Sequence, residues 1–195
     1  PMTDNSLTIG SANRLIKSLP KKPHVATIGM GMTVSKVEAL ISLIKNLKSN
    51  GTRLVLDASA LIPKVITEIT ETGTIITPHA GEFKRIFNQD VGISEEDIIS
   101  SATRMASRHK ITIILKGWLN VIADPSGKVA TIKRSTPAMT VGGTGDVLAG
   151  LVAALYSKIN SAFDASALGI YFNGLAARLA FERVGLHMVA TDLIE

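Results

Sequence analysis

Short apolar runs alternate along the chain with longer stretches in which apolar residues recur at helical spacing. The runs predict strands, at about residues 24–30, 53–57, 74–77 and 111–115. Helical spacing and capping signals predict helices, at about residues 11–19, 35–50, 63–71, 94–109 and 162–183, with one more that runs from the glycines near 145 to about residue 156. Strands that alternate with helices are typical of a three-layer α/β fold, so we expect a mostly parallel sheet with helices on both faces.

The alternation breaks after residue 118, where two β-type segments follow each other directly. Leu119–Ala123 and Val129–Lys133 flank the turn sequence Pro125-Ser126-Gly127. This arrangement predicts one antiparallel hairpin within the otherwise parallel sheet. Because no Pro/Gly/Ser-rich linker divides the chain, we expect residues 1–195 to form a single α/β domain.

Composition and charge narrow the class of protein. The 195 residues include 46% hydrophobic side chains and no cysteine, which excludes disulfides and thiol chemistry and fits a cytoplasmic location. No apolar run approaches the ~18 residues of a membrane span, so we expect no membrane partner. The net charge of +5 comes from scattered basic residues without interleaved aromatics. This pattern argues against nucleic acid as a partner and suits a small polyanion such as a nucleotide.

A strongly apolar helix is preceded by the glycine cluster Gly142-Gly143-Thr144-Gly145-Asp146. Backbone N–H groups at the start of a helix bind phosphate, and glycines let an anion approach them closely. No lysine follows the last glycine, so this is not a Walker A loop. A glycine-rich turn into a core helix would give the same sequence. Asp146 is either the base that accepts a hydroxyl proton during phosphoryl transfer or an acid that stabilises the helix start.

Polar residues also follow the predicted strands. His79 and Glu82 come after the third strand, Asp57 ends the second, and Lys116 follows the fourth. Ligands of open α/β sheets bind at the carboxyl ends of the strands, where these side chains would meet. Structural alternatives stay open: His79 beside a proline turn, Asp57 as a cap of its loop, and Lys116 as a solvated strand end. Gly29-Met30-Gly31 lacks the third glycine of a dinucleotide fingerprint.

Four segments in fixed order resemble one enzyme family. They are Val55–Leu61 (VLDASAL), Ile76–Phe83 (ITPHAGEF), Leu115–Ala123 (LKGWLNVIA) and Val141–Gly150 (VGGTGDVLAG). Together they resemble the ADP- or ATP-dependent NAD(P)H-hydrate dehydratases of the ribokinase-like superfamily, and Ala190–Leu193 is similar to the family's closing segment. The resemblance implies a ribokinase-like fold and a lyase that repairs hydrated NADH or NADPH. In this family a nucleotide phosphorylates the hydrate hydroxyl, and loss of phosphate regenerates the dihydronicotinamide.

The resemblance also implies roles for individual residues. Asp146 would meet the reacting hydroxyl as the catalytic residue, and Gly31 and His79 would contact the hydrate. The nucleotide would lie against Lys116, Gly117, Trp118, Leu119, Asn120, Gly143, Thr144 and Gly145. ADP or ATP is the expected co-substrate. Mg²⁺ is expected because the transferring phosphates carry charge that needs neutralising, although no motif identifies its ligands.

Three departures from the family pattern are visible. The sequence has Gly29-Met30-Gly31 where the family usually has Gly-Pro-Gly, and Asn173-Gly174 where His-Gly is common. The family's N-terminal strand and glycine-rich helical segment are missing, so we expect an N-terminally shortened chain. It is either a fragment or a natural short form that completes its site from another subunit, and we expect a homo-oligomer. A ribokinase-like small-molecule kinase and a non-catalytic adenine-nucleotide-binding fragment stay open as alternatives.

Overall fold

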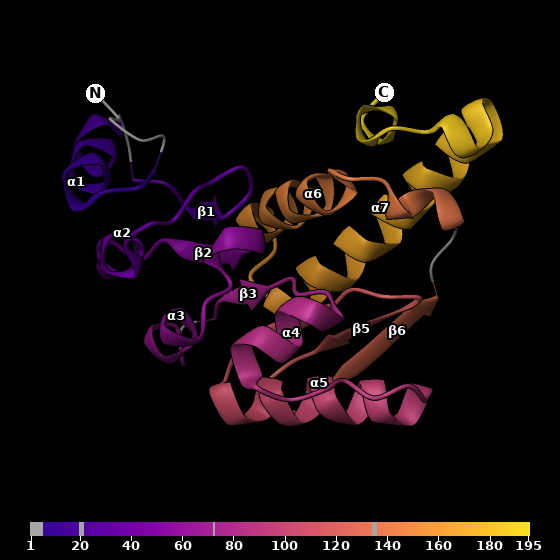
Figure 1. Ribbon diagram of the computed structural model, residues 1–195, viewed down its shortest axis with the longest axis horizontal. Helices are drawn as coiled ribbons and strands as arrows, with labels where there is room; N and C mark the ends of the chain where they lie inside the picture. The colour runs from indigo at the N-terminus through magenta and orange to yellow at the C-terminus, as the bar shows by residue number, and fades with distance from the viewer. Residues whose placement is uncertain (1–5, 20–21, 72, 134–135) are drawn as a thin grey trace.

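The computed structural model describes residues 6–19, 22–71, 73–133 and 136–195 (Figure 1). Within these residues a six-stranded sheet forms the middle layer. In spatial order its strands are β1 (Val25–Ile28), β2 (Arg53–Leu56), β3 (Ile75–Ile76), β4 (Thr112–Leu115), β5 (Leu119–Ala123) and β6 (Val129–Lys133). Strands β1 to β4 are parallel, whereas β5 is antiparallel to both β4 and β6. The predicted parallel sheet with one antiparallel hairpin, formed by β5 and β6, is therefore confirmed.

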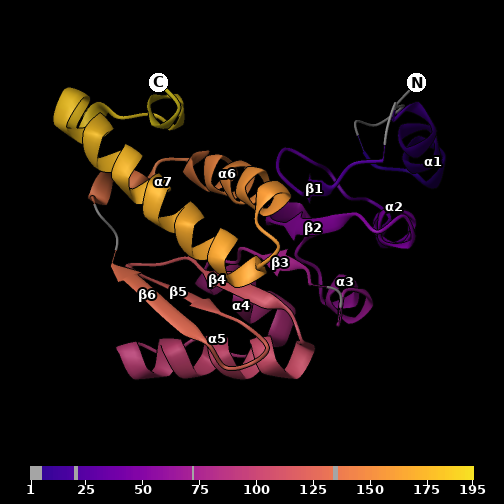
Figure 2. The ribbon, with the colours of Figure 1, turned by 180° about the vertical axis from the view of Figure 1, so that it is seen from behind.

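Helices cover both faces of this sheet. Along the chain they are α1 (Ile9–Ser18), α2 (Val37–Ser49), α3 (Pro63–Glu68), α4 (Ala80–Phe87), α5 (Glu95–His109), α6 (Thr144–Lys158) and α7 (Ala162–Val184). Parallel neighbours need a crossover connection, and α2, α3 and α5 make these crossovers on one face. Helices α6 and α7 follow the last strand and pack on the other face (Figures 1 and 2).

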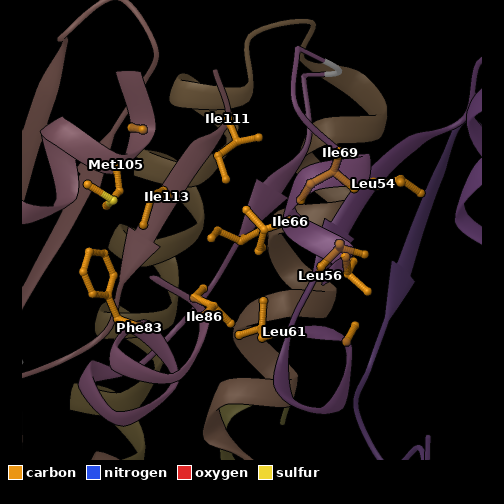
Figure 3. Close-up of a cluster of buried hydrophobic side chains, with 14 of the residues drawn as sticks. Leu54, Leu56, Leu61, Ile66, Ile69, Phe83, Ile86, Met105, Ile111 and Ile113 are labelled. Atoms are coloured by element: carbon orange, nitrogen blue, oxygen red, sulfur yellow. The ribbon is translucent and has the colours of Figure 1, made fainter. Parts of the chain in front are cut away.

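Alternate strand residues divide the core between the two faces, because successive side chains of a strand point in opposite directions. Leu54 and Leu56 are buried on the side of α2, α3 and α5 (Figure 3), whereas Val55 between them is buried on the side of α6 and α7. Strand β4 repeats the pattern, with Ile113 on the first side and Ile114 on the second. Strands β2 and β4 are thus buried on both sides, which explains the continuous apolar runs at these places in the sequence.

Helices α6 and α7 pack closely against each other. A β-carbon at Gly169 of α7 would lie 2.5 Å from Val152 Cγ2 of α6, so glycine is what permits this separation. The contact holds α6 and α7 together over the face of the sheet that they cover. Although α7 has 23 residues, no helix in the described part of the chain is long and apolar enough to cross a membrane.

Side-chain caps set the starts of several helices. Helix α1 is capped by Thr8 rather than by Ser11, the predicted cap: Thr8 Oγ1 accepts from the Ser11 N–H at 3.1 Å, and Ser11 Oγ accepts from the Thr8 N–H at 2.9 Å. The reciprocal bonds place the start three residues earlier than a single hydroxyl suggests. For α5 the prediction is confirmed, since Ser94 Oγ accepts from the Asp97 N–H at 3.1 Å.

Candidate active site

The carboxyl ends of β1 to β4 meet at one edge of the sheet. Gly29 follows β1 with a φ of +126°, in the region that favours glycine. A β-carbon at Gly29 would lie 1.8 Å from the carbonyl oxygen of Asp57, the residue after β2. The backbone N–H of Asp57 donates to the Ile28 carbonyl oxygen at 3.0 Å. Glycine therefore allows the ends of the first two strands to approach closely, and this contact places Asp57.

An ion pair joins Asp57 to Lys116, the residue after β4. Asp57 Oδ1 lies 2.8 Å from Lys116 Nζ, and only 3% of the Asp57 side chain and 20% of the Lys116 side chain are exposed. The backbone N–H of Lys116 donates to the Pro78 carbonyl oxygen at 2.8 Å, which continues the β3–β4 pairing past the strand ends. Because an unpaired buried carboxylate is costly, Asp57 requires a cation at this position.

Helix α6 begins beside this ion pair. Its N-cap residue is Gly143, which has a φ of +93° and no side chain with which to cap the helix. The first N–H groups of a helix have no partners within the helix, so they are free to bind an anion. A β-carbon at Gly145 would lie 3.3 Å from Lys116 Nζ, so the lysine cation stands against the first turn of α6. The cation and the helix start together place positive charge and backbone N–H donors at one point, which is the chemistry that an anion requires.

His79 begins helix α4, an element that the sequence pattern does not predict. Its Nδ1 accepts hydrogen bonds from the N–H groups of Gly81 at 3.0 Å and Glu82 at 3.2 Å. In return, Glu82 Oε2 accepts from the His79 N–H at 2.9 Å. This capping box has histidine where Ser or Thr is usual, so the ordinary helix-start signal is missing from the sequence. Because Nδ1 is engaged, a ligand would meet His79 at Nε2, which lies 3.6 Å from Glu82 Oε2 on a side chain that is 60% exposed.

A cavity of about 590 Å³, a size typical of small-molecule sites, brings most of the predicted site residues together. Its lining includes His79, Lys116, Gly117, Asn120, Gly143, Thr144, Gly145 and Asp146, together with Asp57 and Glu82. The remaining predicted residues, Gly31, Trp118 and Leu119, are not part of this lining. Gly31 and Trp118 are exposed, whereas the Leu119 side chain is buried in the hydrophobic core.

Three carboxylates line the cavity: Asp57, Glu82 and Asp146. Asp146 is exposed in the first turn of α6, and its side chain has no hydrogen-bond or ion-pair partner among the described residues. Across the described ranges, no group of three or more His, Cys, Asp or Glu residues could hold a metal ion. In phosphoryl-transfer sites Mg²⁺ is bound by one or two carboxylates and by the substrate phosphates. The oxygen donors of the lining fit a Mg²⁺ of that kind, held mainly by a nucleotide.

Helix α7 contributes lining residues that are not among the predicted site residues, although Asn173-Gly174 stands out in the sequence as a departure from the family pattern. They are Ile170, Tyr171, Asn173, Gly174, Leu175 and Arg178. Asn173 is 4% exposed, and its Oδ1 has no hydrogen-bond partner among the described residues. The signal in the sequence is an amide on the apolar face of a helix, three residues after Ile170. Such a position is equally compatible with an internal hydrogen bond, so the pattern does not reveal a ligand contact.

Solved structures show which class of protein has this fold. A ribokinase-like superfamily protein from Enterococcus faecalis V583 superposes with a TM-score of 0.70 and 22% identity, covering 87% of this chain and 60% of that chain. The ADP/ATP-dependent NAD(P)H-hydrate dehydratase from Bacillus subtilis, co-crystallised with ATP and Mg²⁺, gives a TM-score of 0.76 and 26% identity, covering 87% of this chain and 61% of that chain. The protein therefore has a ribokinase-like fold, as predicted.

Sequence comparison identifies the family within this class. A family model described as NAD(P)H-hydrate dehydratase matches residues 2–195. The ADP-dependent (S)-NAD(P)H-hydrate dehydratase of Nitrosopumilus maritimus strain SCM1 is 43% identical over 194 residues, covering 100% of this chain and 67% of that protein. The chain thus spans about two thirds of the length of this curated relative. It belongs to the NAD(P)H-hydrate dehydratase family, and the predicted resemblance is confirmed.

Proposed function

We propose that this chain dehydrates hydrated NADH or NADPH with ADP as phosphoryl donor, giving the reduced cofactor, AMP and phosphate. The observation that carries the proposal is that Lys116, the start of α6 and Asp146 line one cavity. Membership of the family supports the substrate class, and the relative named as ADP-dependent supports ADP as the donor. ATP is the second donor to test, since the Bacillus subtilis enzyme is named ADP/ATP-dependent.

In this proposal the nucleotide phosphates bind at the start of α6. The N–H groups of the first turn and the helix dipole attract negative charge there, and the Lys116 ammonium adds a full positive charge beside Gly145. The buried Asp57 carboxylate holds that ammonium in position, so the cation is oriented before the nucleotide arrives. His79 is proposed to contact the hydrate through Nε2, because its Nδ1 caps α4.

Asp146 is proposed to orient the hydrate hydroxyl and to take up its proton as the hydroxyl oxygen attacks the terminal phosphorus of ADP. The bond between that phosphorus and the bridging oxygen breaks, and AMP leaves. A carboxylate is a weak base, but phosphoryl transfer has a loose transition state that mainly requires positioning. The phosphate then leaves the ring carbon, and loss of a proton from the neighbouring carbon restores the ring double bond.

Mg²⁺ is part of the proposal as a companion of the nucleotide. One or both of the other lining carboxylates, Asp57 and Glu82, would hold it together with the phosphates, which leaves Asp146 to take up the proton. When bound, it neutralises negative charge on the phosphates.

A recovery assay tests the proposal. The protein is incubated with hydrated NADH, Mg²⁺ and either ADP or ATP, and both the dihydronicotinamide absorbance and the free phosphate are followed. Recovery with ADP and release of equal amounts of AMP and phosphate would support the proposal, whereas absence of recovery by folded protein would contradict it. A product that keeps its phosphate would instead indicate a small-molecule kinase, and nucleotide binding without turnover would indicate a binding module.

Asp146→Asn tests the role of the carboxylate. We expect kcat to fall by about 10²-fold or more, because the base that receives the hydroxyl proton is removed, while nucleotide affinity stays within a few-fold. Asp90→Asn is the matched control, since Asp90 is an exposed acid that pairs with Lys84 and is not part of the cavity lining. Turnover by Asp146→Asn that equals turnover by the control would contradict the assignment.

Assembly of copies of the chain into a homo-oligomer stays a prediction. Helix α7 has four large apolar residues of which between 38% and 57% of the surface is exposed: Leu168, Tyr171, Phe172 and Leu179. Exposed apolar side chains that gather on one element often mark a contact surface. Analytical ultracentrifugation measures the oligomeric state, and a monomer at the concentration of the assay would contradict the prediction.

A further inference from the structure

A buried amide oxygen in the wall of the cavity lacks a hydrogen-bond partner among the described residues. Asn173 of α7 lines the cavity and is 4% exposed, and no described residue donates a hydrogen bond to its Oδ1. An unpaired buried acceptor destabilises a folded protein, so native proteins rarely keep one. An apolar residue of similar size would fit an interior helix position without that cost. Thr77 Oγ1 is equally unpaired among the described residues, but only Asn173 lines the cavity, so a ligand bound there is the source of the donor that we consider for Asn173.

The surroundings of Asn173 indicate which part of a nucleotide would reach it. Ile170 lies one turn earlier on the same helix and lines the cavity together with Ile132 of β6 and Met139 of the short helix η2 (Pro137–Thr140). These side chains are apolar, whereas most charged groups of the lining, such as Lys116, come from the strand ends and from the starts of α4 and α6. Arg178, which lies on α7 itself, is the exception. Phosphates at the charged end would direct the base of the nucleotide toward the apolar end, where its flat faces are buried.

We propose that Asn173 is a specificity-determining residue for the nucleotide, and that its Oδ1 accepts a hydrogen bond from the 6-amino group of adenine. This role rests on the proposed function, which places an adenine nucleotide in the cavity. An amide oxygen can only accept, so its partner must carry an N–H or O–H group. The 6-amino group is the exocyclic donor of the adenine base. The 2′- and 3′-hydroxyls of the ribose are the other donors on the nucleoside, and a ligand that lacks only the 6-amino group separates the base from both.

Calorimetric titration with three diphosphates tests the contact: ADP, purine riboside 5′-diphosphate, which lacks the 6-amino group, and 2′-deoxy-ADP. We expect the unaltered protein to bind the purine analogue about tenfold more weakly than ADP, since one hydrogen bond is lost and the buried oxygen stays unpaired. 2′-deoxy-ADP should bind like ADP. In Asn173→Leu, ADP should weaken to the affinity of the purine analogue, and the two ligands should then bind within twofold of each other.

Thermal unfolding of the nucleotide-free protein gives a second readout. Asn173→Leu should raise Tm, because it removes an unpaired oxygen and keeps the volume, even though it weakens ADP binding. A residue with a purely structural role would lower stability and affinity together. Thr77→Val is the matched control: Thr77 is 0% exposed, its Oγ1 also lacks a partner among the described residues, and it is not part of the cavity lining. This control should raise Tm and leave the affinity for ADP unchanged.

The outcomes separate this role of Asn173 from the proposed function. If the unaltered protein binds ADP and the purine analogue equally, or loses affinity for 2′-deoxy-ADP instead, the role of Asn173 is overturned while the proposed function stands. If it binds no ADP at all, both are overturned. The ligand series on the unaltered chain decides the question even where Asn173→Leu does not fold.

Discussion

The ion pair between Asp57 and Lys116 leads to a prediction in which the two single variants differ. Coulomb's law at the observed 2.8 Å, with an effective dielectric constant of about 20, gives an attraction of about 6 kcal/mol. Most of this attraction only offsets the hydration that both charges lose, so the cost of breaking the pair depends on how buried the remaining partner is. Asp57 is 3% exposed and Lys116 is 20% exposed, so the carboxylate has the less favourable surroundings when left alone.

We therefore expect Lys116→Met to destabilise the protein more than Asp57→Asn does. Lys116→Met leaves the buried carboxylate unpaired, which should lower the free energy of unfolding by about 3–5 kcal/mol. Asp57→Asn leaves an ammonium that still reaches water, so the free energy of unfolding should fall by only about 1–2 kcal/mol, a value between those for surface and buried ion pairs. In the double variant Asp57→Asn/Lys116→Met neither charge is unpaired, so it should be more stable than Lys116→Met alone.

Urea unfolding of the four proteins, from the unaltered chain to the double variant, gives the coupling free energy. Asp90→Asn is the matched control, because Asp90 and Lys84 lie at a similar 2.9 Å but are 76% and 62% exposed. It should change the free energy of unfolding by at most about 1 kcal/mol. Additive effects within about 0.5 kcal/mol, or a larger loss in Asp57→Asn than in Lys116→Met, would refute the reasoning from burial.

Three further predictions concern backbone contact, helix packing and pH. Gly29→Ala would place a β-carbon 1.8 Å from a backbone oxygen, so it should lower the free energy of unfolding in urea by about 3 kcal/mol or more. Gly127 also has a positive φ but open space around it, so Gly127→Ala should lower the free energy of unfolding by only about 1 kcal/mol. Gly169→Ala should lower Tm despite the better helix propensity of alanine, because its β-carbon would clash with Val152. Adding Val152→Ala to this variant should restore part of the lost stability. A rise in Tm for Gly169→Ala alone would contradict the tight packing. Burial lowers the pKa of His109 from its ordinary value of 6.5, so the unfolded chain takes up a proton more readily than the folded protein. The free energy of unfolding should therefore fall as pH drops below about 6.5. His109→Gln should weaken this pH dependence, and an unchanged pH profile in the variant would contradict the prediction.

Local sequence signals were sufficient for most of the fold. The apolar run Ile111–Leu115 predicts a strand, and the structure has one at Thr112–Leu115 with all four side chains buried. The hairpin of Leu119–Ala123 with Val129–Lys133 is found where its turn residues predict it. The helix that begins after Ser94 has its cap in the sequence. Such elements depend on neighbouring residues along the chain, so a pattern of side chains is enough to identify them.

Part of the candidate site was also predictable. The residue types themselves indicate phosphate binding where glycines precede a helix and a lysine follows a buried strand. A parallel sheet then brings the carboxyl ends of its strands to one edge. The sequence therefore predicted a phosphate-binding site that includes Gly143, Gly145, Asp146 and Lys116. The structure places all four in the lining of one cavity, and their roles stay predictions. Helix α4 was missed, because a histidine caps it in place of Ser or Thr.

Only the tertiary structure decided which distant groups meet. The strand pattern predicted that Asp57 and Lys116 lie at the same edge of the sheet. Because they are 59 residues apart and β3 lies between their strands, only the structure shows that they form a buried ion pair. Asn173 sits on an apolar helix face, and whether its amide is paired inside the protein or left for a ligand depends on what packs around α7. Residue types and short spacings can be taken directly from the sequence. Burial and long-range pairing depend on how strands and helices pack, and no single segment of the chain determines that packing.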